Sequence, residues 1–266
     1  MWLVAASGPA HAVEPVDRFP TVAAAYLIEA EGKIVASHRA DRRLPPASLT
    51  KIMTALLVLE RGRLDDVVTV SAAATRETGT RVGLRPGERL AVKYLLAIAL
   101  VQSANDACHA LAAHVAGDEA RFVAQMNRRA STLGLADTHF VNACGHDHPR
   151  HSSTARDLLR LTHVALQHPL FVDLVAAVEL HVPTVDGTRS FHLVNNNELV
   201  GRYPGATGVK SGYTPKAGKC LVALAERDRR RVLLVLLNAP DRWWTAVDML
   251  DHAFAQLAGG AASGPR

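Results

Sequence analysis

The chain has 266 residues, which suits one large domain or two small ones, and 48% of them are apolar, so a substantial core is expected. The formal net charge is +5, but the basic residues are scattered and aromatic residues make up only 5%, so we predict no nucleic-acid partner. The sequence contains no apolar run of membrane-spanning length, and neither an internal repeat nor a low-complexity tract.

The N-terminus carries a small-x-small pattern, Ala10-His11-Ala12, of the kind that signal peptidases cleave. The segment before it is short and lacks a basic start, so it is either the end of an export signal or a simple small-residue terminus. We favour export. We expect a leader remnant at 1–20, one folded domain at 21–258 and a flexible tail at 259–266.

The cysteines and a histidine-rich loop give little functional information. Cys108, Cys144 and Cys220 form an odd set, which allows one disulfide and one free thiol but does not decide the redox compartment. Histidines cluster at 146–151, but Pro149 interrupts the loop. Because metal ligands usually come from helix or turn spacings with supporting partners, we predict no metal site.

The first half of the chain predicts a strand hairpin followed by helices. Glu31-Gly32 is typical of a hairpin turn, and Gly62 is expected to end the first helix. In chain order we expect strands at 21–29 and 33–38, a helix at 48–61, an extended piece at 67–70, a loop at 78–88 and a helix at 92–101.

The second half predicts further helices and then a run of strands. We interpret Trp243 and Trp244, in the last helix, as core packing. In chain order we expect helices ending near 115, at 120–133 and at 154–167, strands at 220–225 and 232–237, and a helix at 241–257.

Ser48 and Lys51 form a Ser-x-x-Lys pattern at the start of an apolar helix, directly after Pro45 and Pro46. Residues three apart lie on one helix face, so the lysine amine can reach the serine oxygen. A serine hydroxyl needs a nearby base, and a lysine can be that base when burial or a second cation lowers its pKa. The alternative is a capped surface helix with a solvent-seeking lysine.

Ser103 and Asn105 lie at a polar break between two helices. A hydroxyl there can relay a proton, and a carboxamide can accept from a lysine and donate to a substrate carbonyl. The alternative is that Ser103 caps the next helix and Asn105 only makes the turn.

A third pattern, Lys210-Ser211-Gly212, opens the run of antiparallel strands. It places a cation and a hydroxyl at a sheet edge, where Gly212 allows a ligand backbone to approach closely. The alternative is an ordinary basic strand start.

Together, and in this order, the three patterns resemble those of the penicillin-recognising serine enzymes. The chain most resembles the D-alanyl-D-alanine carboxypeptidase family of penicillin-binding proteins, over roughly residues 21–257. The resemblance implies an α/β (α+β) fold of the serine β-lactamase/DD-peptidase type, in which helices flank an antiparallel sheet and form an all-helical subregion. The segments that carry the resemblance are 46–54, 103–107, 151–157 and 208–218.

The resemblance also implies roles for individual residues. Ser48 would attack the carbonyl of a terminal D-Ala-D-Ala bond, and Lys51 would take its proton. Ser103 would help to protonate the leaving D-alanine, while Asn105 would hold Lys51 and the substrate amide. The backbone N–H groups of Ser48 and Tyr213 would bind the oxyanion.

Lys210 would keep the site positive and, with Ser211 and Thr214, would bind the terminal carboxylate. No cofactor or metal is implied. The expected partners are peptidoglycan stem peptides as substrates and β-lactams as inhibitors, in a periplasmic or otherwise exported protein without a stable membrane anchor.

Several positions depart from the family pattern. Ser211 replaces a threonine found in many relatives, Glu198 stands where many carry a basic residue, and Cys144-Gly145-His146 replaces small and leucine residues. Many relatives also continue into a second domain, whereas this sequence predicts a single one.

Three alternatives stay open. A β-lactamase would need a deacylating base, and Glu119 and Glu179 lack the Glu-x-x-Leu-Asn pattern that supplies it. A D,D-endopeptidase would use the same residues to cut cross-links. A non-catalytic muropeptide-binding protein would not need an intact Ser48 and Lys51.

Overall fold

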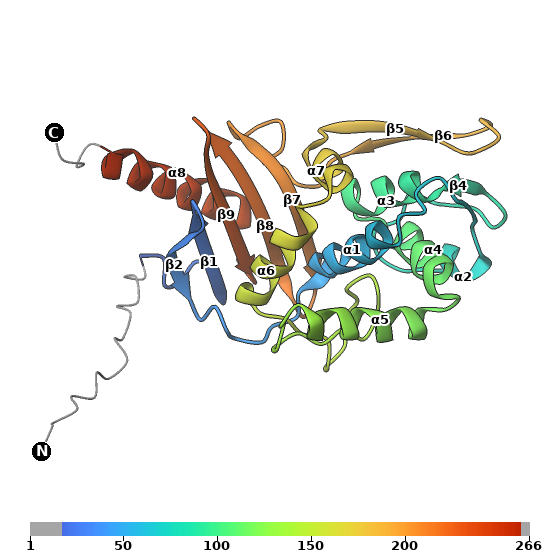
Figure 1. The fold of residues 1–266 in the computed structure, drawn as a ribbon, viewed down its shortest axis with the longest axis horizontal. Helices are drawn as coiled ribbons and strands as arrows, with labels where there is room; N and C mark the ends of the chain where they lie inside the picture. The colour runs from blue at the N-terminus through green and yellow to red at the C-terminus, as the bar shows by residue number, and fades with distance from the viewer. Residues whose placement is uncertain (1–17, 262–266) are drawn as a thin grey trace, which may run out of the picture.

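The computed structural model describes residues 18–261, and a five-stranded antiparallel sheet forms its centre (Figure 1). In space the strands follow the order β2-β1-β9-β8-β7, so the N-terminal hairpin pairs with the last strand of the chain. The predicted export-signal remnant at Ala10-His11-Ala12 lies outside the described residues. The strands are β1 (Ala25–Ala30), β2 (Lys33–His38), β7 (Ala206–Thr214), β8 (Gly218–Arg227) and β9 (Arg230–Leu237).

The first hairpin has the predicted turn and second strand, but its first strand begins at Ala25 rather than at Thr21. Glu31 and Gly32 form its two-residue turn, with φ values of 50° and 73°. Such left-handed turns match the twist of the strands they join. Ala30 therefore pairs with Lys33, and the ladder continues to Tyr26 and His38.

Both faces of the sheet are covered, because apolar residues alternate in direction along its strands. On β9, Leu234 belongs to the core under α8 (Arg242–Ala261), while Leu233 and Val235 belong to the core shared with the other helices. Figure 1 shows α8 on one side of the sheet and the helical part of the molecule on the other. This second, larger core holds the Ser48 segment in place.

The helical part stands beside β7, the edge strand that carries the third motif (Figure 1). Among the described helices, none combines the length and apolar character needed to cross a membrane. The elements of this helical part are η1 (Ala47–Thr50), α1 (Lys51–Arg61), β3 (Val67–Thr69), α2 (Ala72–Thr75), β4 (Arg89–Ala91), α3 (Val92–Val101), α4 (Asn105–Ala116), α5 (Glu119–Thr132), α6 (Ala155–Ala165), α7 (Pro169–Ala176), and the hairpin β5 (Glu179–Pro183) with β6 (Ser190–Val194).

Most predicted elements are present, but α2, β4, α7 and the β5–β6 hairpin were not predicted. The hairpin did have a signal, because Asp186-Gly187 lies between its strands and such a pair favours a tight turn. The last helix also continues to Ala261 rather than ending near Leu257, so it includes the first residues of the predicted tail.

The interpretation of both tryptophans as core packing is wrong for Trp244, whose side chain is 76% exposed. Neighbouring residues of a helix point about 100° apart, so two consecutive side chains cannot both face the sheet. Trp243 does pack against the core under α8, and the Arg242 guanidinium lies 4.4 Å from its ring centre.

Candidate active site

Ser48 lies in the short 3-10 turn η1, and Lys51 is the first residue of α1. The Ser48 side chain does not cap the helix; instead, Lys51 Nζ lies 3.1 Å from Ser48 Oγ. The 3-10 turn and the following helical turn therefore bring the two groups together, as the spacing predicted.

The Lys51 amine is enclosed by protein. The residue is 1% exposed, and Nζ lies 2.7 Å from Asn105 Oδ1 and 2.8 Å from the carbonyl oxygen of Cys144. Burial, and secondarily the charge of Lys210, lower the pKa of Lys51 well below its usual value. These are the conditions under which a lysine can act as a base near neutral pH.

Asn105 begins α4 and joins this helix to the loop that precedes β4. Its Nδ2 donates to the carbonyl of Thr78 at 2.6 Å, and its backbone N–H donates to Thr80 at 2.7 Å. The next residue, Asp106, is buried and accepts from the backbone N–H groups of Gly83 and Leu84, each at 3.0 Å. These bonds fix the amide orientation that presents Asn105 Oδ1 to the lysine.

Ser103 occupies the turn between α3 and α4, with φ at 61°, and is 7% exposed. Within residues 18–261, no hydrogen bond joins it to Ser48 or Lys51. Its predicted part in proton transfer stays a prediction.

On β7, the Lys210 side chain is buried and Nζ donates to the Ser211 carbonyl at 3.0 Å. Burial, with the nearby charge of Arg242, lowers the pKa of Lys210 to about 7. The two predicted carboxylate-binding hydroxyls donate elsewhere: Ser211 Oγ to the carbonyl of Asn196 at 3.1 Å, and Thr214 Oγ1 to a carboxylate. A substrate carboxylate bound at both hydroxyls would have to replace both acceptors.

Gly212 allows a close approach, but to the protein itself rather than to a ligand. A Cβ atom at this position would lie 2.8 Å from the backbone nitrogen of Ser48 and 3.0 Å from Ala47 Cβ. The absence of a side chain thus lets β7 pack directly against η1. It brings the backbone of Tyr213, whose side chain is 63% exposed, next to the serine turn.

A cavity of about 540 Å³ lies beside Ser48, but Ser103, Lys210 and Ser211 are not among its lining residues. Asn105 lines it together with Ser48, while Lys51 lies buried behind them. The remaining lining comes from residues 78–80, 144–147 and 213–215.

The family model for D-alanyl-D-alanine carboxypeptidase, Peptidase S11, matches residues 15–241. The chain belongs to this family. Among its curated relatives, D-alanyl-D-alanine carboxypeptidase DacF of Bacillus subtilis is 36% identical over 241 residues, covering 87% of this chain and 62% of the relative. D-alanyl-D-alanine carboxypeptidase DacB2 of Mycobacterium tuberculosis is 35% identical over 232 residues, covering 84% of this chain and 79% of the relative.

A D-alanyl-D-alanine endopeptidase of Pseudomonas aeruginosa is 33% identical over 245 residues, covering 89% of this chain and 77% of the relative. Among solved structures, the Streptomyces K15 DD-transpeptidase superposes with a TM-score of 0.84 at 29% identity, covering 92% of this chain and all of that one. The family, the peptidase class and the fold class predicted from the sequence are therefore confirmed. The chain spans about 60% of the length of some carboxypeptidase relatives.

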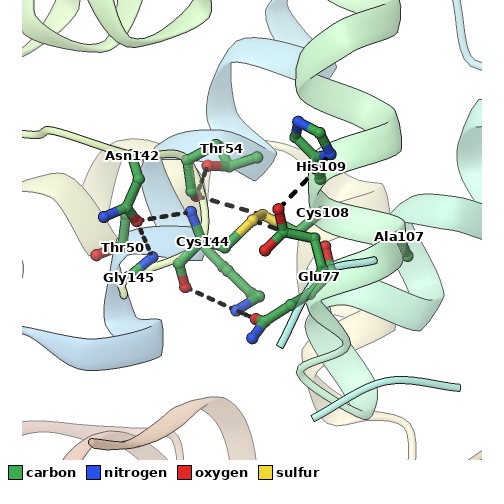
Figure 2. Close-up of a disulfide and its surroundings, with 12 residues drawn as sticks. Thr50, Thr54, Glu77, Ala107, Cys108, His109, Asn142, Cys144 and Gly145 are labelled. Carbon is green, nitrogen blue, oxygen red and sulfur yellow. Dashed lines mark hydrogen bonds and ion pairs between the residues drawn. A yellow bond between two sulfur atoms is a disulfide. The ribbon is translucent and has the colours of Figure 1, made fainter. Parts of the chain in front are cut away.

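Sequence reasoning missed the contribution of the 142–147 loop to the site of this family member. Cys144 forms a disulfide with Cys108 (Figure 2), which leaves Cys220 free and buried. The Cys144 carbonyl accepts from Lys51. Asp147 accepts from the Thr214 hydroxyl and from the backbone of Lys216. A backbone carbonyl leaves no trace in a sequence, but the unusual Cys144-Gly145-His146 run was a signal.

Two charged side chains near the cavity were also not predicted. Glu77 pairs with His146 at 2.7 Å, and its charge raises the pKa of Lys51 against the effect of burial. Arg242, at the start of α8, donates to the Gly212 carbonyl at 2.6 Å. It therefore supports β7 from behind.

His151 is a buried neutral support of the Ser48 turn rather than a metal ligand. Its Nδ1 accepts from the Val141 backbone at 3.1 Å, so Nε2 carries the hydrogen and donates to Thr50 Oγ1 at 2.9 Å. Thr50 Oγ1 donates in turn to the Ala47 carbonyl at 2.8 Å. Burial is the main reason that the pKa of His151 is lowered to about 4. The ring therefore stays neutral above that pH, which keeps this chain of bonds intact.

Proposed function

We propose that the protein is a serine D-Ala-D-Ala carboxypeptidase that removes the terminal D-alanine from peptidoglycan stem peptides through an acyl-Ser48 intermediate. The observation that carries this proposal is the buried Lys51 amine, 3.1 Å from Ser48 Oγ and with a lowered pKa. The family membership supports the same reaction.

In acylation, Lys51 in its neutral form takes the hydroxyl proton as Ser48 Oγ attacks the carbonyl carbon of the D-Ala-D-Ala bond. The developing oxyanion accepts from the backbone N–H groups of Ser48 and Tyr213. The C–N bond then breaks, and Ser103 helps to return the proton from Lys51 to the departing amine. Water hydrolyses the ester and restores the Ser48 hydroxyl.

The substrate is held by its terminal carboxylate. Lys210 supplies the positive charge, while the hydroxyls of Ser211 and Thr214 turn from Asn196 and Asp147 toward the substrate. Asn105 orients both Lys51 and the peptide. The protein needs no metal or cofactor for these steps.

A β-lactam presents a carbonyl that mimics the scissile peptide, so it acylates the same serine, and its ester hydrolyses slowly. We infer that the enzyme works on peptidoglycan in the periplasm or an equivalent exported location. We also infer that residues 21–258 form the catalytic domain.

The first test is the intact mass of the protein during incubation with benzylpenicillin, with Ser48→Ala in parallel. We expect one lasting adduct in the wild type and none in Ser48→Ala, and release of D-alanine from a synthetic D-Ala-D-Ala peptide by the wild type alone. Rapid loss of the adduct with hydrolysis of bulk penicillin would instead indicate a β-lactamase. A folded wild type that forms no adduct would refute Ser48 as the nucleophile and favour a muropeptide-binding protein.

A second candidate is D,D-endopeptidase activity, because a relative of which this chain covers 77% carries that name. The same acylation chemistry would then cut a cross-link between two stem peptides. Purified cross-linked muropeptides distinguish the two: an endopeptidase releases two monomers, whereas a carboxypeptidase releases only free D-alanine.

A further inference from the structure

The Cys108–Cys144 disulfide joins two segments that both contact the Lys51 amine. Cys108 lies on α4, one turn after Asn105, and Cys144 lies in the 142–147 loop. The two Cα atoms are 5.9 Å apart, and both residues are buried. Figure 2 shows Cys144, Gly145 and Asn142 on one side of the sulfur bridge and Cys108 and His109 on the other.

Each joined segment supplies one oxygen to Lys51. Asn105 Oδ1, on α4, lies 2.7 Å from Nζ, and the carbonyl oxygen of Cys144 lies 2.8 Å from it. A neutral amine has two N–H groups and one lone pair. When these two oxygens take both N–H groups, the lone pair is left for the Ser48 hydroxyl, which lies 3.1 Å away.

Besides the disulfide and the bond from Lys51, Cys144 itself is held through its backbone N–H, which donates to Asn142 Oδ1 at 3.3 Å within the same loop, and the other anchors of the loop act on its neighbours. Thr54 Oγ1 donates to the Ala143 carbonyl at 2.6 Å, and Glu119 accepts from the Ala143 backbone N–H at 2.9 Å. Asn142 Oδ1 accepts from the backbone N–H groups of residues 145 and 146. The strongest tie between Cys144 itself and α4 is the disulfide.

We propose that the Cys108–Cys144 disulfide is a positioning element for the general base: it fixes the Cys144 carbonyl relative to Asn105 and so aims the Lys51 lone pair at Ser48. This inference rests on the proposed role of Lys51. Opening the disulfide lets the carbonyl drift and the amine rotate. In the part of the chain that the structure describes, Lys210 and Ser211 make no hydrogen bond to either joined segment, so substrate binding is preserved while acylation slows.

The experiment starts from Cys220→Ala as the reference enzyme, because its only remaining cysteines are Cys108 and Cys144. The test variant adds Cys108→Ala and Cys144→Ala. The matched control adds Met249→Ala instead, which opens a cavity in the core under α8, on the opposite face of the sheet from η1. For each protein, stopped-flow measurements with a fluorescent penicillin give the binding constant and the limiting acylation rate.

We expect the acylation rate of the double-cysteine variant to fall about tenfold, with an unchanged binding constant, because a misplaced catalytic group costs one to two orders of magnitude. The Met249→Ala control should lose thermal stability but keep its acylation rate. In the reference enzyme, dithiothreitol reduces the bridge to two thiols and is itself oxidised to a cyclic disulfide. Reduction should slow acylation in the same way, and reoxidation should restore it.

Equal acylation rates in the reference and the double-cysteine variant would overturn the proposal. So would a loss of rate that merely follows thermal stability, with Met249→Ala and the double variant affected alike. If the reference enzyme, with its disulfide verified by mass, forms no Ser48 adduct, then the proposed function itself fails, and the two failures are distinguishable.

Discussion

Gly145→Ala tests whether the contact between the 142–147 loop and η1 aligns the site. A Cβ atom on Gly145 would lie 1.9 Å from the carbonyl oxygen of Ala47 and 2.9 Å from the nitrogen of Ser48. All of these are backbone atoms, so no flexible side chain can move aside. An ordinary contact is about 3.5 Å, so either the loop or η1 must shift by roughly 1.5 Å.

The expected cost has two parts. Gly145 has φ at 92°, and an L-residue in this region costs about 1–2 kcal/mol. Overpacking adds about 1–3 kcal/mol. For a domain of this size, a total of about 3 kcal/mol lowers Tm by about 6–12 °C. Because the shift displaces either Ser48 or the carbonyl that holds Lys51, acylation should slow about a hundredfold.

Gly187→Ala is the matched control, because Gly187 also has a positive φ, 69°, but a Cβ atom there would meet nothing within 4 Å. It should lower Tm by only about 2–4 °C, from backbone strain of about 1 kcal/mol, and should leave acylation unchanged. Calorimetry and penicillin acylation are measured on both variants. If Gly145→Ala acylates within about twofold of the wild type despite a shift of this size, then fine alignment of Ser48 and Lys51 does not limit the reaction.

Three further predictions concern titrating groups. Glu77→Gln removes a charge that raises the pKa of Lys51, so the acidic limb of the kcat/KM profile should move to lower pH. Lys210 loses its charge as pH rises through about 7, so KM for a carboxylate-bearing substrate should rise above pH 7. Arg242→Gln, which raises the Lys210 pKa, should move that rise to higher pH. His151 has a folded-state pKa of about 4 against 6.5 when unfolded, so its contribution to stability is complete above pH 6.5 and is lost as pH falls toward 4. Urea unfolding should show a loss of about 3 kcal/mol over that window, and His151→Gln should abolish this part of the slope.

The three motifs were predictable because each depends on side-chain identity and short spacing. Ser48 and Lys51 meet through one turn of helix, and β7 presents Lys210 at a sheet edge. What could not be predicted depends on the path of the backbone. The second oxygen at Lys51 is the Cys144 carbonyl, and a carbonyl is present in every residue, so no residue type marks it.

The roles of the predicted hydroxyls show a second limit of sequence reasoning. Residue type says that Ser211 and Thr214 can bind a carboxylate, but not which acceptor each prefers without substrate. In the structure, the Thr214 hydroxyl donates to the carboxylate of Asp147, which is the same chemical group that we propose it binds in the substrate. Displacing it leaves Asp147 with the backbone N–H of Lys216, so the exchange costs less than a complete loss of partners.

The proposed reaction needs opposite protonation states in the two buried lysines, and their surroundings favour that assignment. The charge of Lys210 disfavours a second ammonium in the same enclosed site, so it lowers the pKa of Lys51; a neutral Lys51 then exerts no charge on Lys210. Burial and the charge of Arg242 lower the pKa of Lys210 to about 7, while burial and the charge of Lys210 lower the pKa of Lys51 well below its usual value. The proposed chemistry therefore requires a pH window in which Lys51 is neutral and Lys210 is charged. Glu77 raises the pKa of Lys51 and so moves the lower limit of this window, and Arg242 lowers the pKa of Lys210 and so moves the upper limit. A substrate carboxylate stabilises charged Lys210, so binding should extend the upper limit of the window without removing the free amine that starts the reaction.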